Sequence, residues 1–241
     1  MSAPQPAVPV AERSVAREYL ESIVVAVILA LFVRTFAVQA FKIPTGSMEE
    51  NLLIGDHLLV NKLVYSPSFG SFEDGLFGKK AIKRGHVVVF KFPQEPERDF
   101  IKRVIGLPGE KVEVRDKQVL IDDKPLAESY TFFKDQPLRR DDPEYSIRAD
   151  DLRYNWGPQV VPAGQLFVMG DNRDNSRDSR FWGFLPIDQV KGRALVIYWS
   201  YEATRDEYQR TGVWDWLKDL GNMVVHIFDR TRWGRFFHLI R

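Results

Sequence analysis

An uninterrupted apolar run near the N-terminus restricts the possible folds of this chain more than any other feature. Residues 23–33 read IVVAVILALFV, and a looser apolar window covers residues 19–41, interrupted mainly by Arg34, Thr35 and Gln39. A helix needs ~20 residues to cross the hydrocarbon core of a bilayer. The looser window is long enough when Arg34 extends toward the headgroups. We therefore predict one transmembrane helix over residues 19–41.

Two alternatives to a membrane anchor stay open for this run. Arg13 and Arg17 precede it, which is also the layout of a cleavable signal peptide, and a short apolar helix can equally be buried in a protein core. Positive charge does not orient the helix, because Arg34 and Lys42 follow the run just as two arginines precede it. Residues 1–18 are predicted to form a flexible tail.

Beyond the apolar window, short runs favour β-strands. They are rich in Val, Ile, Leu, Phe and Tyr, and most are bounded by Gly, Pro or Asp: HLLVNKLVY, HVVVFKF, FIKRVIG, KVEVRDKQVLI, QLFVMG and ALVIYWSY. Runs of this length and composition are typical of strands separated by turns. We predict a mostly β fold whose core is built from residues 42–110 and 166–205.

Residues 111–165 are predicted to form an insertion in this β core. Two alternating runs flank Asp116 and Lys117, which is the pattern of a β-hairpin. Residues 135–162 are polar and rich in turn-forming residues, so we expect a surface excursion there.

The C-terminal segment, residues 206–241, combines aromatic with basic side chains. Trp214, Trp216 and Trp233 lie among several Lys and Arg residues. This composition is found where an amphipathic segment lies in the headgroup region of a membrane. A helix that packs on a β body has a similar pattern, so both interpretations stay open.

Composition excludes several classes of function. The chain has 34 Lys and Arg against 33 Asp and Glu, a net charge of +1, so it lacks the positive field of a nucleic-acid-binding protein. It has no cysteine, which excludes disulfides, thiol nucleophiles and cysteine metal sites. The sequence also lacks a P-loop, a dinucleotide-binding glycine motif, a zinc-protease motif and an EF-hand calcium loop. We expect no nucleic-acid partner, no cofactor and no metal.

Histidine is the usual base for a serine nucleophile, and this chain has four. His57 and His86 lie in strand-like runs, whereas His226 and His238 lie in the C-terminal segment. No Gly-x-Ser-x-Gly motif accompanies them. We predict that all four histidines are structural.

Ser47 lies in a short turn directly after the apolar window. Pro44 restricts the backbone and Gly46 relaxes it, so the segment FKIPTGSMEE predicts a tight turn that presents the serine hydroxyl. Taken alone, such a serine is more commonly a turn residue than a nucleophile.

Lys102 lies in the middle of the strand-like run FIKRVIG. In a strand it shares a face with Phe100 and Val104, so an inward orientation surrounds the amine with apolar groups. Lowering a lysine pKa from ~10.4 to about 7 takes about 4 kcal/mol of desolvation. A neutral Lys102 then serves as a base. The alternative is a lysine whose stem packs while its ammonium group reaches water.

A third segment, GDNRDNSRDSRFWGFLP, is dense in carboxylates and guanidinium groups. Its charged residues are Asp171, Arg173, Asp174, Arg177, Asp178 and Arg180. Taken alone, such a segment is a solvated turn as readily as a functional loop. Its alternating charges predict a rigid loop braced by internal ion pairs.

The segments IPTGSM, IKRVIGLPGE and GDNRDNSRDSRFWGFLP follow an apolar helix in this order. In this combination the chain resembles the bacterial type I signal peptidases, the leader peptidases. The resemblance covers residues 23–201 and is weakest across the predicted insertion. It implies a mostly antiparallel β fold, shared with LexA-type serine-lysine proteases, with one N-terminal transmembrane helix.

The resemblance also implies roles for individual residues. Ser47 matches the nucleophile and Lys102 its general base. Thr45 matches the residue whose hydroxyl joins the Ser47 backbone N–H in an oxyanion hole, and Ser176 matches the residue that orients the lysine. The residues expected to brace the loop are Arg103 with Asp171 and Arg180 with Asp178.

By the same resemblance, the chain is a serine endopeptidase that removes signal peptides from secreted preproteins. It is expected to cut after small residues, in Ala-X-Ala-like sites, through an acyl-enzyme. The implied location is the bacterial cytoplasmic membrane, with a single pass, the tail in the cytoplasm and the catalytic domain on the outer side. Preproteins and the lipid bilayer are the expected partners, and we expect a monomer.

Two other functions are alternatives to this one. A LexA-type self-cleaving protease needs a DNA-binding domain and an Ala-Gly site before its serine, whereas Ala163-Gly164 lies after Ser47. A non-enzymatic, membrane-tethered β domain that binds partners requires Ser47 to be a turn residue and Lys102 to be solvated. The protonation state of Lys102 separates this last alternative from an enzyme.

Overall fold

The protein is described by a computed structural model, which gives the structure of residues 15–63, 81–134, 152–202, 221 and 225–240. The chain divides into two compact units, Met1–Ala37 and Val38–Arg241. Most of the predicted tail, residues 1–14, and the tryptophans Trp214 and Trp216 lie outside the described residues.

The first unit contains the helix α1, Val15–Phe32, and a short π-helix, Val33–Ala37. No residue of α1 is buried within the chain. Among the described residues, no helix combines the length and the apolarity that a membrane span requires. The predicted helix over residues 19–41 was too long at its C-terminal end. Val38–Lys42 instead forms strand β1, because its backbone hydrogen-bonds to a neighbouring strand.

The second unit is mostly β, as the short apolar runs predicted. Its strands are β1 Val38–Lys42, β2 Asp56–Asn61, β3 Val87–Phe92, β4 Glu95–Gly106, β5 Lys111–Arg115, β6 Gln118–Ile121, β7 Lys124–Pro125, β8 Trp156–Val160, β9 Gln165–Met169, β10 Leu185–Pro186, β11 Val190–Ser200 and β12 His238–Leu239. Its short helices are the 3-10 helices Gly46–Met48, Ile187–Gln189 and Trp233–Arg235, and α4 Ser179–Trp182.

The larger sheet has eight strands in the order β1-β2-β11-β3-β4-β9-β10, with β12 paired to β11. All of its named pairs are antiparallel. Buried positions alternate with less buried ones along β2, while four consecutive residues of β3 are buried. The centre of this sheet is therefore covered on both faces.

The smaller sheet has the order β7-β6-β5-β8 and lies within the predicted insertion. The predicted hairpin is confirmed: β5 pairs with β6, and Asp116 and Lys117 at its tip both have positive φ, 49° and 67°. The predicted surface excursion over residues 135–162 was wrong in part, because Trp156–Val160 forms strand β8 beside β5. Trp156 is buried against Phe167, which favours the strand over an exposed loop.

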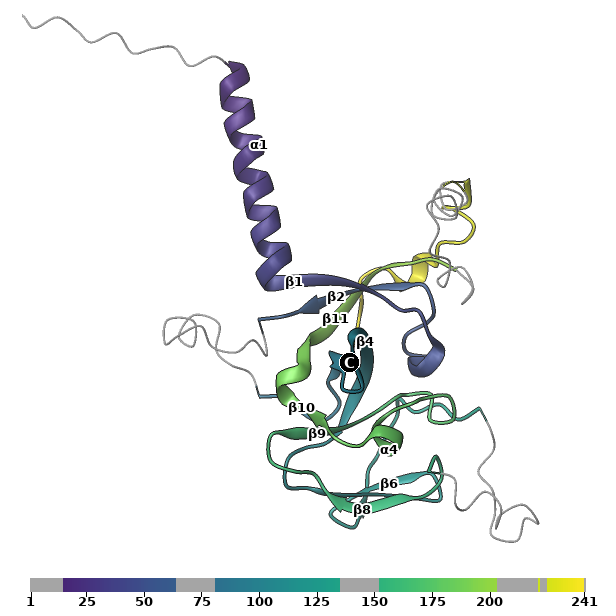
Figure 1. Cartoon of the computed structure of the whole chain (residues 1–241). Helices are drawn as coiled ribbons and strands as arrows, with labels where there is room; N and C mark the ends of the chain where they lie inside the picture. Colours follow the sequence, from purple (N-terminus) through teal and green to yellow (C-terminus); the bar gives the residue numbers. More distant parts are fainter. Residues whose placement is uncertain (1–14, 64–80, 135–151, 203–220, 222–224, 241) are drawn as a thin grey trace, which may run out of the picture. The chain divides into compact units, whose positions relative to one another are not determined.

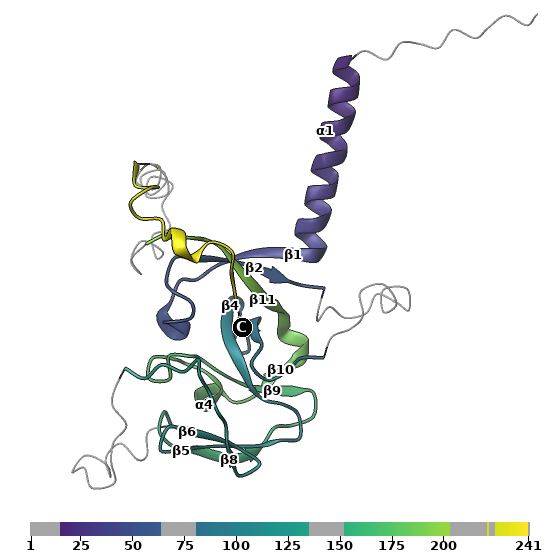
Figure 2. The ribbon, with the colours of Figure 1, turned by 180° about the vertical axis from the view of Figure 1, so that it is seen from behind.

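The smaller sheet packs against the larger one and so forms a second layer. Figures 1 and 2 show β6 and β8 lying beside β9 and α4 in both views. The core between the layers contains side chains from both sheets: Ile105, Val112, Val114, Val119, Ile121, Trp156, Val161, Phe167 and Met169. Shared apolar burial therefore joins the insertion to the β core.

The described end of the chain is fastened to the larger sheet. Strand β12 pairs with β11, and Arg235 forms an ion pair with the buried Asp56, Nη2 to Oδ2 at 2.6 Å. Phe228, Trp233 and Phe237 are largely exposed. In this segment Arg232 and Arg235 thus bond to the rest of the second unit, whereas several aromatic rings lie on the surface.

Candidate active site

Ser47 lies in a 3-10 turn, Gly46–Met48, that follows β1. The turn is anchored by its neighbour Met48, which is fully buried, and by Leu52, whose backbone N–H donates to the Met48 carbonyl at 2.7 Å. Ser47 itself is 8% exposed. The turn predicted from proline and glycine therefore presents its hydroxyl inward, beside the larger sheet.

Lys102 reaches the same place from strand β4. It pairs with Val88 of β3 in the middle of the larger sheet and is 4% exposed. Its Nζ donates to Ser47 Oγ at 2.7 Å and to the Ile101 carbonyl at 2.9 Å. The inward orientation that the strand pattern allowed is the one adopted, and the solvated-lysine alternative is excluded.

The surroundings of Lys102 favour its neutral form. Burial lowers the pKa of the Lys102 amine from 10.5 to about 8, against the opposing charges of Asp178 and Asp171 and with the help of Arg180. The Phe100 ring centroid lies 5.5 Å from Nζ, so an aromatic ring stands beside the amine. A substantial neutral fraction near pH 8 gives the site an amine that can accept a proton from Ser47.

A cleft of about 470 Å³ opens over these two residues. Phe41, Phe92, Phe100 and Ile101 form apolar parts of its wall, and Thr45 lies at its edge. Thr45 has an extended backbone and its side chain does not cap the turn that follows. Thr45 therefore lines the same cleft as Ser47.

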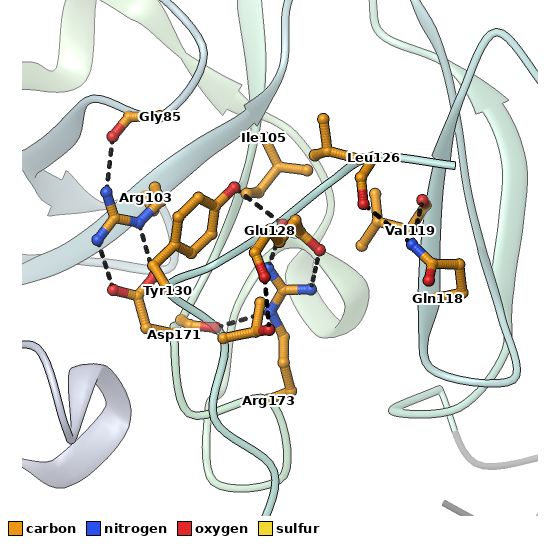
Figure 3. Close-up of polar contacts among 12 residues, drawn as sticks. Gly85, Arg103, Ile105, Gln118, Val119, Leu126, Glu128, Tyr130, Asp171 and Arg173 are labelled. Atoms are coloured by element: carbon orange, nitrogen blue, oxygen red, sulfur yellow. Dashed lines mark hydrogen bonds and ion pairs between the residues drawn. The ribbon is translucent and has the colours of Figure 1, made fainter. Parts of the chain in front are cut away.

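The predicted loop pairs are both present and deeply buried. Arg103 donates from Nε and Nη2 to the two carboxylate oxygens of Asp171, at 2.8 and 2.7 Å, as Figure 3 shows. Arg180 donates to Asp178 in the same two-point manner, at 2.9 Å for each bond. Burial alone raises the pKa of the Asp178 carboxyl. The charge of Arg180 and the hydrogen bonds that the carboxylate accepts have a larger effect, so the pKa of Asp178 is lowered overall.

Ser176 is placed near the site, but the structure does not bring it into contact with Lys102. Its hydroxyl is buried and makes no well-aligned hydrogen bond among the described residues, although it lies close enough to the Asp178 carboxylate to help lower the pKa of that group. The oxygen lies against Gly170, where a side-chain carbon would collide with it. Its role in orienting the lysine stays a prediction.

Sequence reasoning missed several residues that hold the turn and the loop together. The Asn172 backbone N–H donates to the Ser47 carbonyl at 3.1 Å, and its side-chain amide donates to the Gly46 carbonyl at 3.2 Å. Asn51 donates to Asp171 at 2.9 Å. Asn172 lies in the segment GDNRDNSRDSRFWGFLP, so the sequence motif could have indicated its importance. Asn51 lies outside the three motif segments, and no local pattern indicates its contact.

The histidines are not part of this cleft. His57 packs on Trp199, with ring centroids 4.8 Å apart, and burial lowers its pKa to about 4. Burial likewise lowers the pKa of His86 to about 4, assisted by Arg193 and Lys83. Among the described residues, no group of His, Asp or Glu side chains has a metal-binding arrangement.

Comparison with known proteins identifies the family to which this chain belongs. Residues 16–199 match the family model described as signal peptidase, peptidase S26. The chain belongs to this family. Signal peptidase I of Aquifex aeolicus is 35% identical, with 76% of this chain and 84% of that protein covered. Signal peptidase I of Leptolyngbya laminosa is 39% identical, with 76% and 79% covered.

A third relative, signal peptidase I of Pseudomonas fluorescens, is 34% identical over 76% of this chain and 72% of its own length. Membership in the signal peptidase family makes the protein a serine peptidase, and the resemblance noted in the sequence is thereby confirmed. The family assignment does not by itself assign roles to Ser47, Lys102 or Thr45.

Proposed function

We propose that this signal peptidase family member removes signal peptides from preproteins by means of a serine-lysine dyad. The observation that carries the proposal is the 2.7 Å contact between the Lys102 amine and the Ser47 hydroxyl, both buried at the floor of an open cleft. A buried lysine with a lowered pKa next to a nucleophile is the arrangement that general-base catalysis requires.

In the first half of the reaction, Ser47 Oγ attacks the carbonyl carbon of the scissile peptide bond. Its proton passes to the Lys102 amine across the 2.7 Å separation of the two groups, because the neutral amine has a lone pair that accepts from the Ser47 hydroxyl. The oxygen of the tetrahedral intermediate accepts hydrogen bonds from the Thr45 hydroxyl and the Ser47 backbone N–H. The Lys102 ammonium then protonates the leaving nitrogen, the C–N bond breaks, and Ser47 is left as an ester.

In the second half, water attacks the ester carbonyl and Lys102 accepts one proton from that water. The C–O bond to Ser47 breaks, and the ammonium group returns its proton to Ser47 Oγ. The products are a peptide with a new carboxylate and one with a new amine. Burial of Lys102 favours this cycle because it lowers the pKa of the amine and so raises the fraction that is neutral between turnovers.

The proposed substrate is an extended preprotein segment with small side chains in Ala-X-Ala-like positions. Phe41, Phe92, Phe100 and Ile101 give the cleft an apolar wall, against which small side chains of an extended peptide can lie. In the proposed binding mode, large side chains are rejected by steric clash. The proposed reaction requires no cofactor, since each proton transfer uses Ser47, Lys102 or water.

We further propose that the protein works at the outer face of the bacterial cytoplasmic membrane, as a single-pass protein with its N-terminus in the cytoplasm. The apolar side chains of α1, among them Ile23, Ile28 and Leu31, are more than half exposed within the chain. Exposed apolar side chains in such number need an apolar surrounding, which the hydrocarbon core of a bilayer supplies. Extraction of membranes with alkaline carbonate tests this location, and release of the full chain contradicts it.

Cleavage of a preprotein by purified variants tests the dyad. Ser47→Ala and Lys102→Ala should each abolish processing while circular dichroism and the melting temperature stay near those of the parent protein. Lys102→Met is a matched third variant, because it keeps the volume and burial without the amine. Undiminished processing by any of the three folded variants refutes the assignment.

A further inference from the structure

We call residues 170–186, the segment GDNRDNSRDSRFWGFLP, the catalytic loop. Two of its neighbouring residues, Arg173 and Asp174, form ion pairs with residues of the insertion. Arg173 donates from Nη1 and Nη2 to the two oxygens of Glu128, at 2.9 and 2.5 Å. The side chains of Arg173 and Glu128 are 2% and 6% exposed. Figure 3 shows Glu128 between Arg173 and Tyr130, whose hydroxyl donates to the same carboxylate at 2.9 Å.

The second ion pair reverses the charges. Lys117, at the tip of the β5–β6 hairpin, contacts Asp174 Oδ1 at 2.8 Å, and the two side chains are 3% and 5% exposed. The Lys117 ammonium also lies 4.4 Å from the Tyr154 ring centroid and 5.3 Å from that of Phe133. The insertion thus holds the loop at two consecutive positions, 173 and 174.

A short path connects these ion pairs to the nucleophile. Arg173 donates from Nε to the Gly170 carbonyl at 3.1 Å, and its backbone N–H donates to the Phe132 carbonyl at 2.9 Å. Asn172, directly before it, donates to the Ser47 carbonyl at 3.1 Å. A displacement of residue 173 is therefore transmitted to the Ser47 turn through the hydrogen bonds of Asn172 to Ser47 and Gly46.

Stability alone is a poor explanation for two such pairs. Desolvation offsets much of the attraction in a buried ion pair, and apolar side chains of similar volume often stabilise a protein as well or better. Ion pairs with fixed two-point geometry do, however, specify one arrangement of the chain. A single fixed arrangement matters for a serine and a base that must stay in contact, because small misplacements of reacting groups slow catalysis ~100-fold.

We propose that Glu128 and Lys117 are positioning residues, which keep the catalytic loop in the register that aligns Ser47 with Lys102. This inference rests on the dyad proposed above. It gives the insertion a function in catalysis, since both residues lie within residues 111–165.

Steady-state cleavage of a peptide with an Ala-X-Ala site tests the proposal, at a temperature well below each variant's melting point. Glu128→Gln keeps the size and removes the charge, and Lys117→Met does the same for the second pair. Each should lower kcat at least tenfold and leave KM within twofold. Glu128→Asp, which restores the charge on a shorter side chain, should recover part of the lost kcat.

Glu110→Gln is the matched control. It breaks the Arg84–Glu110 pair, 2.6 Å, which lies in the core directly before the insertion and does not contact the loop. This variant should lower the melting temperature and keep kcat within twofold. The proposal is overturned if Glu128→Gln and Lys117→Met keep parental kcat, or if their kcat falls no further than that of Glu110→Gln at equal loss of melting temperature.

Failure of the dyad gives a different result in the same assay. Ser47→Ala, run in parallel, should have no activity. If it retains activity, the assignment of the nucleophile is wrong and the positioning proposal falls with it. If it is inactive while both ion-pair variants are fully active, the dyad stands and only the positioning role is refuted.

Discussion

The backbone N–H of Asn172 donates a hydrogen bond to the carbonyl oxygen of Ser47, with an N···O distance of 3.1 Å. This bond joins two parts of the chain that are far apart in sequence and brings the loop against the proposed nucleophile. The loop can approach so closely because Gly170 has no side chain. A Cβ at that position would collide with the Ser47 carbonyl and with the Ser176 hydroxyl.

Gly170→Ala is therefore expected to lower kcat at least ~100-fold, since the added methyl must push the loop away from Ser47. It should also lower the free energy of unfolding by about 1–3 kcal/mol, as overpacking does. Peptide cleavage and urea unfolding measure the two effects. Gly234→Ala is the control, because a Cβ there meets no atom within 4 Å. Parental activity in Gly170→Ala contradicts the close approach.

The rate of cleavage should depend on the titration of Lys102. Burial lowers its pKa to about 8, and only the neutral amine accepts a proton, so kcat/KM should rise with pH and level off above the pKa. Lys102→Arg should be inactive at every pH because the guanidinium stays charged. A pH–rate profile of the parent protein checks this, with Lys111→Met as a control that keeps the profile. A rate that is flat from pH 6 to 10, a range spanning about 2 units on either side of the expected midpoint, argues against a lysine base.

The Thr45 hydroxyl offers a separate test of the oxyanion hole. Thr45→Val keeps the shape and removes the donor, so kcat should fall ~100-fold or more, corresponding to ~3 kcal/mol of lost transition-state stabilisation. Thr45→Ser keeps the hydroxyl and should retain most of the activity. Since Thr45 is exposed at the cleft edge, neither change should alter the melting temperature much. Equal activity of the two variants removes Thr45 from the mechanism.

The sequence predicted the parts of this site that local patterns encode. Alternation along β4 indicated that Lys102 shares a face with Phe100, and the turn chemistry around Ser47 indicated a presented hydroxyl. Strand β8 was missed because its residues look polar and turn-rich, and only Trp156, packed on Phe167, gives the strand a buried anchor. A local pattern does not report such long-range packing.

Glu128 shows the same limit in the site itself. Nothing in its neighbourhood distinguishes it from a surface glutamate, and its meaning comes from Arg173, which lies 45 residues away in sequence. Burial and pairing become visible only when the chain is folded. The helix prediction failed at its end for a related reason, since backbone pairing to β2 decides where β1 begins.

The ion pair between Arg235 and Asp56 predicts how the C-terminal segment is fastened. Asp56 is fully buried and accepts from Arg235 at 2.6 and 3.1 Å and from the Leu53 backbone N–H at 2.8 Å. Arg235→Met leaves this carboxylate without its cation. The free energy of unfolding should fall by about 2–4 kcal/mol, somewhat below the usual cost of breaking a fully buried pair because Arg235 is partly exposed.

Urea unfolding followed by fluorescence measures the change, and Lys111→Met is the matched control. The Lys111–Asp123 pair lies at the surface, with side chains 38% and 68% exposed, so its loss should cost less than about 1 kcal/mol. If both variants lose equally little, the C-terminal segment is not held by its ion pair, and strand pairing of β12 with β11 is what fastens it.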